Sequence, residues 1–405
     1  MNEIIIAGAG SGSQEHLTPE VKNEINKADV VVLNSRFLKL IPFAQKGKKI
    51  IILDDFNETF EKIKNEYENK NKNEKILILL SGDSCFYSLL PLIKKFFENK
   101  KIKVLPGLSS LQILCAKAGE VWNDAKILSG HGRDLNAGNF LNVVERNKIT
   151  IVLCDKKNSP VWLAEKLKNF DDIEIFIGSN LGNENEIFLH GKPQDFFYKN
   201  FPELSIVLIK NNAVYSSDKK FLRDGDFFRE KDIVMTNENV RAVILEKLEL
   251  NSKSLFWDIG AGSGSISVSA AYENLSIEVH AVERNAKAAE LISKNAAKFH
   301  LHNIKIYEGS AGKIIKNLPA PTHVFIGGSG GEMKEIFENL ANLKSPVRVV
   351  IACVTLENFS QAYSIMKDLK NFEAVQISVT SSRSLNNELT LMKANNPVLI
   401  LSADF

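Results

Sequence analysis

Three glycines and two carboxylates in the second half of the chain have the types and spacing of a nucleoside-binding site. The run LFWDIGAGSGSISVSAA predicts a strand, a turn with glycine at 260, 262 and 264, and a helix. Glycine lets the backbone approach a ligand where a Cβ would collide. Asp258 precedes the turn, and Glu283 closes the next predicted strand, 25 residues further on. A carboxylate at that strand end can accept both hydroxyls of a ribose.

The surroundings of this turn narrow the ligand class. A dinucleotide-binding GxGxxG pattern requires glycine at 265, where Ser265 stands, so a nicotinamide oxidoreductase is disfavoured. The order Asp258, glycine turn, Glu283 and then Gly309-Ser310-Ala311 after the third strand is similar to that of S-adenosylmethionine methyltransferases. Asp258 alone is compatible with a helix cap and Glu283 alone with a surface acid. The prediction of a methyltransferase therefore depends on their order and spacing.

A second glycine-rich loop follows the fourth predicted strand, in VFIGGSGGEM. Methyltransferases that act on amino groups commonly carry an Asn-Pro-Pro-Tyr type of motif there, and this chain does not. Such a loop can approach a large flat ligand and offers backbone N–H groups to carboxylates, although a plain tight turn is the structural alternative. The loop residues that we expect to contact substrate are Gly327, Gly328, Gly330 and Gly331.

The first half contains the same letters, GAGSGS at residues 8–13, in a different setting. The next helix begins only at LTPEV, with Thr18 as cap and Pro19 at its first position, and no acid ends the strand that follows. A nucleotide held in the same way is therefore not expected here. Two further turns, GDSCFY at 82–87 and PGLSSLQ at 106–112, follow successive predicted strands.

Apolar runs alternate with amphipathic helical patterns along nearly the whole chain, which predicts parallel α/β sheets. The pattern breaks at residues 211–232, which are polar and lack periodicity. We therefore expect one domain at 1–210, with lobes at about 1–112 and 113–210, and a second domain at 233–405. Residues 211–232 are expected to be a linker between them or an arm that reaches onto the second domain.

The composition disfavours several classes of protein. Of 405 residues, 51 are basic and 49 acidic, so the net charge of +2 disfavours a nucleic-acid partner bound through phosphate neutralisation. The four cysteines have no CxxC spacing and the histidines form no HExxH, so no metal site is expected. The start MNEIII is too short for a signal peptide, and no run of 18 apolar residues occurs. These features predict a cytoplasmic protein without a membrane partner.

The first half resembles the tetrapyrrole methylase family. GAGSGSQEHLTPEVKNEINKADVVV is similar to the family's opening motif except at Ser11, and GDSCFY to its Gly-Asp-Pro-x-Phe-Tyr motif except at Ser84; proline is usual at both positions. The resemblance implies a two-lobed class III methyltransferase fold, followed by a Rossmann-like class I methyltransferase domain.

With SGHGR, DIGAGSGS, VERN, FIGGSGG and VTLEN in order, the whole chain is similar to the bifunctional methyltransferase family of the corrin pathway. This resemblance implies that the C-terminal domain methylates precorrin-6B at C15 and removes CO2 from the C12 acetate. The N-terminal domain would methylate C5, giving precorrin-8. The implied cofactor is S-adenosylmethionine, with one site per domain, and the implied assembly is a homo-oligomer, a dimer or a tetramer.

The resemblance also assigns roles to residues. The implied cofactor-binding residues of the second domain are Thr236, Asp258, Gly260, Ala261, Gly262, Ser263, Gly264, Glu283, Ser310 and Ala311. Those of the first domain are Asp83, Phe86, Ser109 and Ser110. Because the substrate carries many carboxylates, Arg133, Arg241 and Arg383 are candidates to bind it, each with the alternative of a solvated surface arginine. Glu357 and His131 are the catalytic candidates; a helix-starting acid and a structural histidine are the alternatives.

Three other functions stay open at this point. The same reactions could act on the cobalt-containing precorrin, since its ring face is similar. A methyltransferase for a protein or RNA substrate is disfavoured by the absent amino-methylation motif and the balanced charge. A binding protein on an inactive methyltransferase fold is disfavoured by the complete set of Asp258, three glycines and Glu283.

Overall fold

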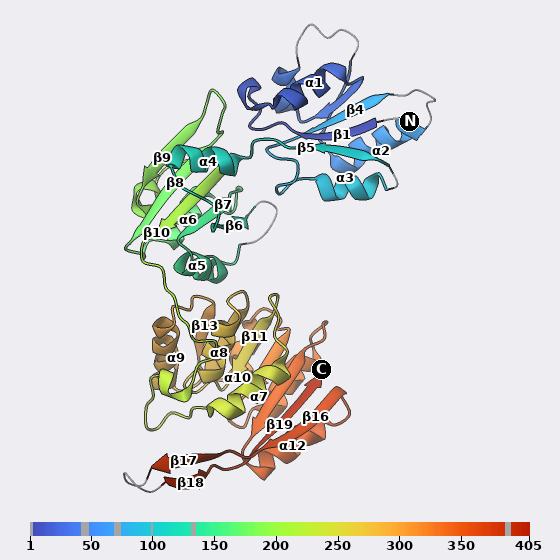
Figure 1. The fold of residues 1–405 in the computed structure, drawn as a ribbon. Helices are drawn as coiled ribbons and strands as arrows, with labels where there is room; N and C mark the ends of the chain where they lie inside the picture. Colours follow the sequence, from blue (N-terminus) through green and yellow to red (C-terminus); the bar gives the residue numbers. More distant parts are fainter. Residues whose placement is uncertain (1–2, 42–47, 69–73, 99, 131–134, 385–389) are drawn as a thin grey trace. The chain divides into compact units, whose positions relative to one another are not determined.

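The computed structural model describes residues 3–41, 48–68, 74–98, 100–130, 135–384 and 390–405 (Figure 1). The chain forms two compact units, Met1–Leu135 with Asn147–Val214, and Asn136–Arg146 with Tyr215–Phe405. The sequence pattern predicts a change of domain near residue 210, but it does not predict that the short segment at 136–146 groups with the second unit.

The first unit begins with a five-stranded parallel sheet in the order β3-β2-β4-β1-β5. Its strands are β1 (Glu3–Gly8), β2 (Val30–Leu33), β3 (Lys49–Ile52), β4 (Lys75–Leu80) and β5 (Ile102–Leu105). Helix α1 (Pro19–Lys27) covers one face, while α2 (Phe56–Glu68) and α3 (Leu90–Phe96) cover the other. Thr18 caps α1 by accepting the Val21 N–H, as the sequence predicts. Both faces of β1 are buried, which explains its continuous apolar run.

The second sheet of this unit, β6-β7-β10-β8-β9, corrects the expectation of parallel strands throughout. Only β6 (Lys126–Ser129) and β7 (Ile149–Leu153) are parallel to each other. Strand β10 (Ser205–Asn211) is antiparallel to β7 and to β8 (Ile173–Ser179), and β9 (Ile187–Gly191) is antiparallel to β8. Residues 180–186 are too few for the crossover that a parallel β8–β9 pair would need. The helices of this sheet are α4 (Ser110–Ala118) and α6 (Pro160–Lys166).

The second unit contains a seven-stranded sheet in the order β13-β12-β11-β14-β15-β19-β16. Its first five positions are parallel, and β19 lies antiparallel between β15 and β16. The strands are β11 (Leu255–Ile259), β12 (Glu278–Glu283), β13 (Ile304–Glu308), β14 (His323–Ile326), β15 (Arg348–Cys353), β16 (Lys370–Ile377) and β19 (Val398–Asp404).

Two groups of helices bury the two faces of this sheet. One apolar core contains residues of α7 (Glu238–Leu248), α8 (Ser265–Glu273) and α9 (Ala286–Lys298). The other contains residues of α10 (Ala311–Ile314), α11 (Met333–Ala341) and α12 (Leu356–Met366). Neighbouring residues of β11 alternate between them, Phe256 in the first core and Trp257 in the second. Helix α5 (Ala137–Arg146) also belongs to this unit.

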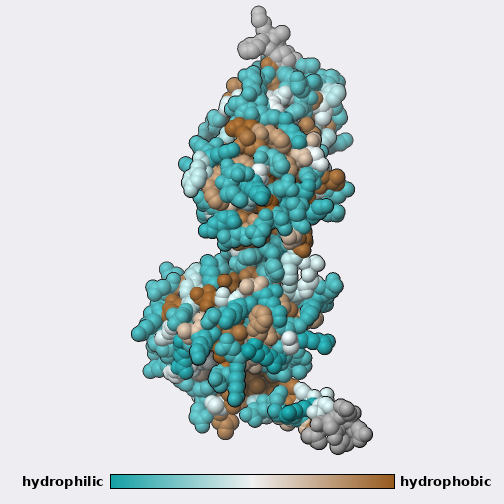
Figure 2. Space-filling view, turned by 90° about the vertical axis from the view of Figure 1, so that its left-hand side faces the viewer, coloured by the Kyte–Doolittle hydropathy of each residue, from teal (hydrophilic) through white to brown (hydrophobic). Residues whose placement is uncertain are grey.

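A separate antiparallel pair, β17 (Thr380–Ser384) and β18 (Thr390–Ala394), extends from the end of this sheet (Figure 1). All ten residues of the pair are exposed. On the face drawn in Figure 2, hydrophilic side chains predominate and hydrophobic ones are scattered between them. Within the described ranges, no helix combines the length and apolar character needed to cross a bilayer.

Candidate cofactor and substrate sites

The loop between β11 and α8 takes a conformation that requires glycine. Gly260, Gly262 and Gly264 have φ values of 71°, 56° and 75°, in the left-handed region. A Cβ at Gly260 would lie 2.3 Å from the Gly328 carbonyl oxygen, and one at Gly262 would lie 2.7 Å from the Val234 carbonyl oxygen. The loop is therefore pressed between the segment before α7 and the glycine loop after β14.

Asp258 is a fully buried carboxylate directly beneath this loop. Its Oδ2 accepts hydrogen bonds from the Ser267 backbone N–H at 3.0 Å and from the Ser267 hydroxyl at 2.5 Å. Its Oδ1 has no hydrogen-bond partner among the residues that the structure describes. The pKa of Asp258 is raised to about 7, chiefly by burial and also by the nearby Glu283 carboxylate, while the Ser267 hydrogen bonds oppose the rise. A cation bound here would stabilise the ionised carboxylate against both burial and the repulsion of Glu283.

Glu283 ends β12 against the same loop. Its Oε2 accepts the Gly262 N–H at 2.8 Å and its Oε1 accepts the Asn285 N–H at 2.9 Å. Each carboxylate oxygen can still accept one more hydrogen bond. The hydroxyl of Ser263, buried in the loop, has no partner within the described ranges. The orphaned Asp258 Oδ1 and Ser263 Oγ fit a bound ligand that is cationic and rich in hydroxyl or amine groups, as S-adenosylmethionine is.

The segment after β13 lies close to Glu283, as its position in the sequence predicts. The Gly309 N–H donates to the Glu283 backbone carbonyl at 2.9 Å. Ser310 then caps α10, and Ala311 is buried in the core beneath it. Thr236 is half-buried on the other side of the loop, two residues after Val234, whose carbonyl accepts the Ser263 N–H at 3.1 Å.

The glycine loop 327–331 lies beside these residues. The Gly327 N–H donates to the Ile259 carbonyl at 2.9 Å, immediately before Gly260, the first glycine of the loop between β11 and α8. Gly330 and Gly331 have φ values of 58° and 91°. A Cβ at Gly330 would lie 2.9 Å from Nη1 of Arg284. Of the residues predicted for the second domain, the structure therefore brings together Asp258, 260–264, Glu283, 309–311 and the glycine loop.

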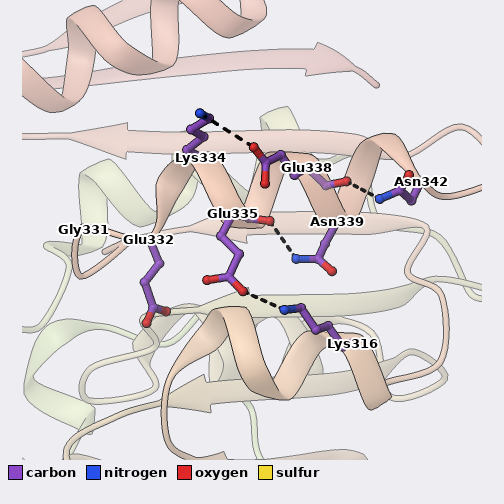
Figure 3. A pocket seen from close by; sticks show the side chains of 8 residues that line it. All are labelled: Lys316, Gly331, Glu332, Lys334, Glu335, Glu338, Asn339 and Asn342. Atoms are coloured by element: carbon purple, nitrogen blue, oxygen red, sulfur yellow. Dashed lines mark hydrogen bonds and ion pairs between the residues drawn. The ribbon is translucent and has the colours of Figure 1, made fainter.

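A polar groove runs along α11 beside this loop (Figure 3). It encloses about 630 Å³ and is lined by Lys316, Gly331, Glu332, Lys334, Glu335, Glu338, Asn339 and Asn342. Glu335 pairs with Lys316 at 2.7 Å, and the lining is charged rather than apolar. Gly331 is the one predicted site residue in this lining, and none of the residues predicted to bind the cofactor lines the groove.

The structure contradicts the expectation that Arg241 binds substrate. Arg241 is 2% exposed, and its Nη1 donates to Asp224 Oδ1 at 3.0 Å and to the Thr236 carbonyl at 2.8 Å. Its Nη2 donates to the Leu222 carbonyl at 2.8 Å, and the guanidinium lies over the Phe227 ring. Leu222, Asp224 and Phe227 belong to the polar segment 211–232, so Arg241 fastens that segment to α7.

The remaining candidates of this domain lie on exposed elements. Glu357 is exposed in the first turn of α12, two residues after the cap Thr355, which is the position of the helix-starting alternative. It follows β15, which is paired with β14, so it lies at the same sheet edge as the glycine loop. Arg383 is exposed on β17, outside the seven-stranded sheet. His131 and Arg133 lie outside the described residues.

In the first unit, three glycines meet where β1, β4 and β5 end. A Cβ at Gly8 would lie 2.5 Å from the Gly82 carbonyl oxygen and 2.6 Å from Gly107 Cα. The Gly10 N–H donates to the Gly82 carbonyl at 3.1 Å, and the Gly82 N–H donates back to the Gly10 carbonyl at 2.8 Å. The first GAGSGS thus serves to join neighbouring loops.

The four polar and aromatic candidates of this unit follow the same strand ends. Asp83 Oδ2 accepts the Gly107 N–H at 2.9 Å and its Oδ1 accepts the Cys85 N–H at 2.8 Å, so Asp83 ties two loops together. Ser109 caps α4 by accepting the Gln112 N–H at 3.2 Å, and Ser110 begins that helix. Phe86 is half-buried and packs on the core of the second sheet.

Ser11 and His16 form a pair that the sequence pattern does not predict. Ser11 Oγ and His16 Nδ1 are 2.7 Å apart, and Asn183 Nδ2 donates to the Ser11 carbonyl at 3.2 Å. A Cβ at Gly182 would lie 2.4 Å from Ser11 Oγ, so this turn closes over the first loop only because residue 182 is glycine. The serine in the family's proline position thus has polar partners. Across the described ranges, no three His, Cys, Asp or Glu side chains converge as metal ligands would.

Each half of the chain matches a known protein family. Residues 3–196 match the model of tetrapyrrole (corrin/porphyrin) methylases, and residues 226–404 match the precorrin methyltransferase domain. A precorrin-6Y C(5,15)-methyltransferase (decarboxylating) from Sinorhizobium is 26% identical over 87% of this chain and 85% of its own length. A cobalt-precorrin-6B C(15)-methyltransferase (decarboxylating) from Salmonella typhimurium is 34% identical over 45% of this chain and 94% of its own length.

A third relative matches a stretch of similar length. It is a probable cobalt-precorrin-7 C(5)-methyltransferase from Methanocaldococcus jannaschii, 35% identical over 45% of this chain and 86% of its own length. The chain therefore belongs to the family of precorrin-6Y C5,15-methyltransferases (decarboxylating), in which a tetrapyrrole methylase domain is fused to a precorrin methyltransferase domain.

Proposed function

We propose that this chain is a cobalamin-biosynthesis enzyme that methylates precorrin-6B at C15, removes CO2 from its C12 acetate and methylates C5, with one S-adenosylmethionine site in each domain. Precorrin methylation with decarboxylation is the activity of the family. One observation carries the C-terminal assignment: Asp258, the glycine turn and Glu283 form one cluster. In this cluster two buried polar atoms, Asp258 Oδ1 and Ser263 Oγ, have no partner among the described residues.

In the C-terminal domain, bound S-adenosylmethionine would supply a methyl group already activated by the sulfonium charge. Glu283 would accept the ribose hydroxyls with the lone pairs that Gly262 and Asn285 leave free. Asp258, whose Oδ1 has no partner in the part of the chain that the structure describes, would oppose the positive charge through the loop. The segment 309–311 would contact the adenine, beside the Glu283 backbone.

The macrocycle would lie at the same sheet edge, over the glycine loop 327–331. Three large apolar side chains near this edge are unusually exposed: Val354 at 68%, Leu356 at 76% and Val234 at 82%. Val354 and Leu356 follow β15, next to β14, and the Val234 carbonyl contacts the cofactor loop. Apolar side chains suit the ring face, and the loop N–H groups suit its carboxylates.

The protein's part in catalysis is mainly alignment and exclusion of water. A meso carbon conjugated to ring nitrogens is enamine-like, so no strong protein base is needed at C15. The new bond from C15 to the methyl carbon would form as the sulfur–methyl bond breaks and S-adenosylhomocysteine leaves. In the decarboxylation, the bond between the acetate CH2 and its carboxyl group breaks, the electron pair enters the protonated ring, CO2 leaves, and a proton completes the methyl group. Glu357 is exposed next to Leu356 at this edge, and we propose that it delivers that proton.

The N-terminal domain would bind its cofactor where Asp83, Phe86, Ser109 and Ser110 follow the strand ends. Because both Asp83 oxygens accept backbone N–H groups, its role is to fix the loops around that site. We further propose a cytoplasmic homo-oligomer, in which the exposed β17–β18 pair, with Leu391 and Met392 on its surface, is covered by a second copy.

Mass spectrometry of precorrin-6B incubated with the full chain and methyl-deuterated S-adenosylmethionine tests the proposal. The expected product carries two deuterated methyl groups and lacks the mass of CO2. Two methyl groups without CO2 loss, or methylation only of a protein or RNA, would refute it. Cobalt-precorrin-6B assayed in parallel decides which form of the substrate is used.

A further inference from the structure

The residue that ends the glycine loop is bonded to the segment that we expect to contact adenine. Glu332 is the N-cap of α11, and its N–H donates to the Ser329 carbonyl at 2.9 Å. Its carboxylate accepts the Ser310 hydroxyl at 2.6 Å and the Gly312 N–H at 3.1 Å. Ser310 and Gly312 flank Ala311, so one side chain joins the substrate loop to the third-strand segment.

A second contact joins the same loop to the strand end that carries Glu283. Arg284 follows Glu283 directly, and its guanidinium lies where a Cβ at Gly330 would come within 2.9 Å of Nη1. Only glycine allows this approach, since residue 330 also has a φ of 58°. The Ser310 and Gly312 hydrogen bonds and the positive charge of Arg284 lower the pKa of Glu332, so its carboxylate is ionised at neutral pH.

The helices that carry these contacts, α10 and α11, pack against each other in one apolar core. Ala311 of α10 and Met333, Ile336 and Phe337 of α11 belong to one buried cluster. Figure 3 draws the Glu332 side chain pointing away from Lys334 and Glu338, which line the groove farther along the helix. Glu332 therefore faces Ser310 and Gly312, while Lys334 and Glu338 of the same helix pair with each other.

We propose that Glu332 and Arg284 form a clasp through which occupancy of the C-terminal cofactor site orders the glycine loop 327–331 for the precorrin. Glu332 is then a positioning residue, which acts through Ser310 and Gly312 and not on the reacting atoms. The inference rests on the proposed function, since it takes 309–311 and Glu283 as cofactor contacts. A cofactor can order the loop only if it binds the clasped state better than the released one.

Initial rates of CO2 release from precorrin-6B test the clasp, because this reaction belongs to the C-terminal domain alone. KM for precorrin-6B is measured with the full chain at low and at saturating S-adenosylmethionine. We expect KM to fall by about 5-fold or more on saturation, the range of ordinary site-to-site coupling. In Glu332→Ala the two KM values should agree to within about 2-fold, and both should be higher than the value of the unmodified chain at saturating S-adenosylmethionine.

Two variants separate positioning from a loss of structure. Glu332→Gln keeps a carbonyl oxygen for the Ser310 hydroxyl and should retain an intermediate dependence of KM on cofactor. Glu338→Ala, an exposed acid on the same helix, should behave as the unmodified chain. Cofactor dependence that survives in Glu332→Ala, or that is lost equally in Glu338→Ala, would overturn the clasp. An unmodified chain that releases no CO2 at all would instead refute the proposed function.

Discussion

The Oε2 atom of Glu283 accepts the backbone N–H of Gly262 at 2.8 Å, so the acid that ends β12 is bonded to the glycine turn that follows β11. The two features lie 21 residues apart in the sequence and on adjacent parallel strands. This hydrogen bond holds the turn in its left-handed conformation and directs the carboxylate along the sheet edge. The proposed cofactor site is therefore assembled before any ligand arrives.

Removing that carboxylate should weaken cofactor binding in one domain only. In Glu283→Ala we expect KM for S-adenosylmethionine in CO2 release to rise by roughly 10-fold to 100-fold, because hydrogen bonds to a charged group are lost. C5 methylation should be unchanged. Glu308 is the cross-strand neighbour of Glu283 and is exposed, so Glu308→Ala is the matched control. Equal effects in both variants would contradict the assignment.

Asp258 should make the stability of the C-terminal domain depend on pH. Its pKa in the folded chain is about 7, against an ordinary value of 3.8. Between these values the folded state binds more protons than the unfolded state, so the free energy of unfolding falls as pH rises through this window. Asp258→Asn should remove that fall. Urea unfolding at about pH 5 and about pH 7 measures the difference between variant and parent; a difference that is constant with pH would contradict the prediction.

Crowding at Gly260 predicts a large loss of stability from one added methyl group. In Gly260→Ala the new Cβ would meet the Gly328 carbonyl at 2.3 Å in a left-handed conformation. The backbone conformation alone costs about 1–3 kcal/mol, and the collision adds to it. Gly328→Ala is the control, because no atom lies within 4 Å of its Cβ. The thermal unfolding midpoint of Gly260→Ala should be lower than that of Gly328→Ala. Similar midpoints would contradict the prediction, because they would show that the loop can shift to accommodate the methyl group.

A corresponding substitution in the first unit should affect C5 methylation alone. In Gly107→Ala the Cβ would lie 2.4 Å from the Gly82 carbonyl oxygen and 2.7 Å from Gly8 Cα, forcing apart the loops that Asp83 ties together. We expect a product with one added methyl group and loss of CO2. Gly119→Ala, at an uncrowded left-handed position, should still give two methyl groups. Loss of CO2 release in Gly107→Ala would mean that the domains do not act separately.

Much of the parallel architecture and the joining of Asp258, the glycine turn and Glu283 follow from the sequence. They do so because the carboxyl ends of successive parallel strands meet at one edge, which places residues by their order alone. The hydrogen-bond partners of side chains do not follow from the order of the strands. Ser267, whose hydroxyl donates to Asp258, lies in the first turn of α8 and belongs to no motif of strand ends. Glu332, which accepts a hydrogen bond from Ser310, likewise follows a glycine-rich loop, and no sequence spacing identifies it as a partner of Ser310.

Two predictions from the sequence are wrong for reasons of tertiary context. The guanidinium of Arg241 appears free when only α7 is considered, but Asp224 and Phe227 return from the preceding polar segment to cover it. Local patterns also do not give strand direction. Strands β8 and β9 have the composition of buried strands, and only the short turn between them makes their pairing antiparallel.

The insertion of β19 between β15 and β16 has a consequence for synthesis on the ribosome. All strands of the first sheet have been made once residue 105 is added, so the N-terminal lobe can fold while translation continues. The seven-stranded sheet lacks an interior strand until residue 404 has emerged from the exit tunnel. Until then β15 has one unpaired edge and β16 has no partner strand, so the nascent C-terminal domain exposes strand edges that can pair with other chains.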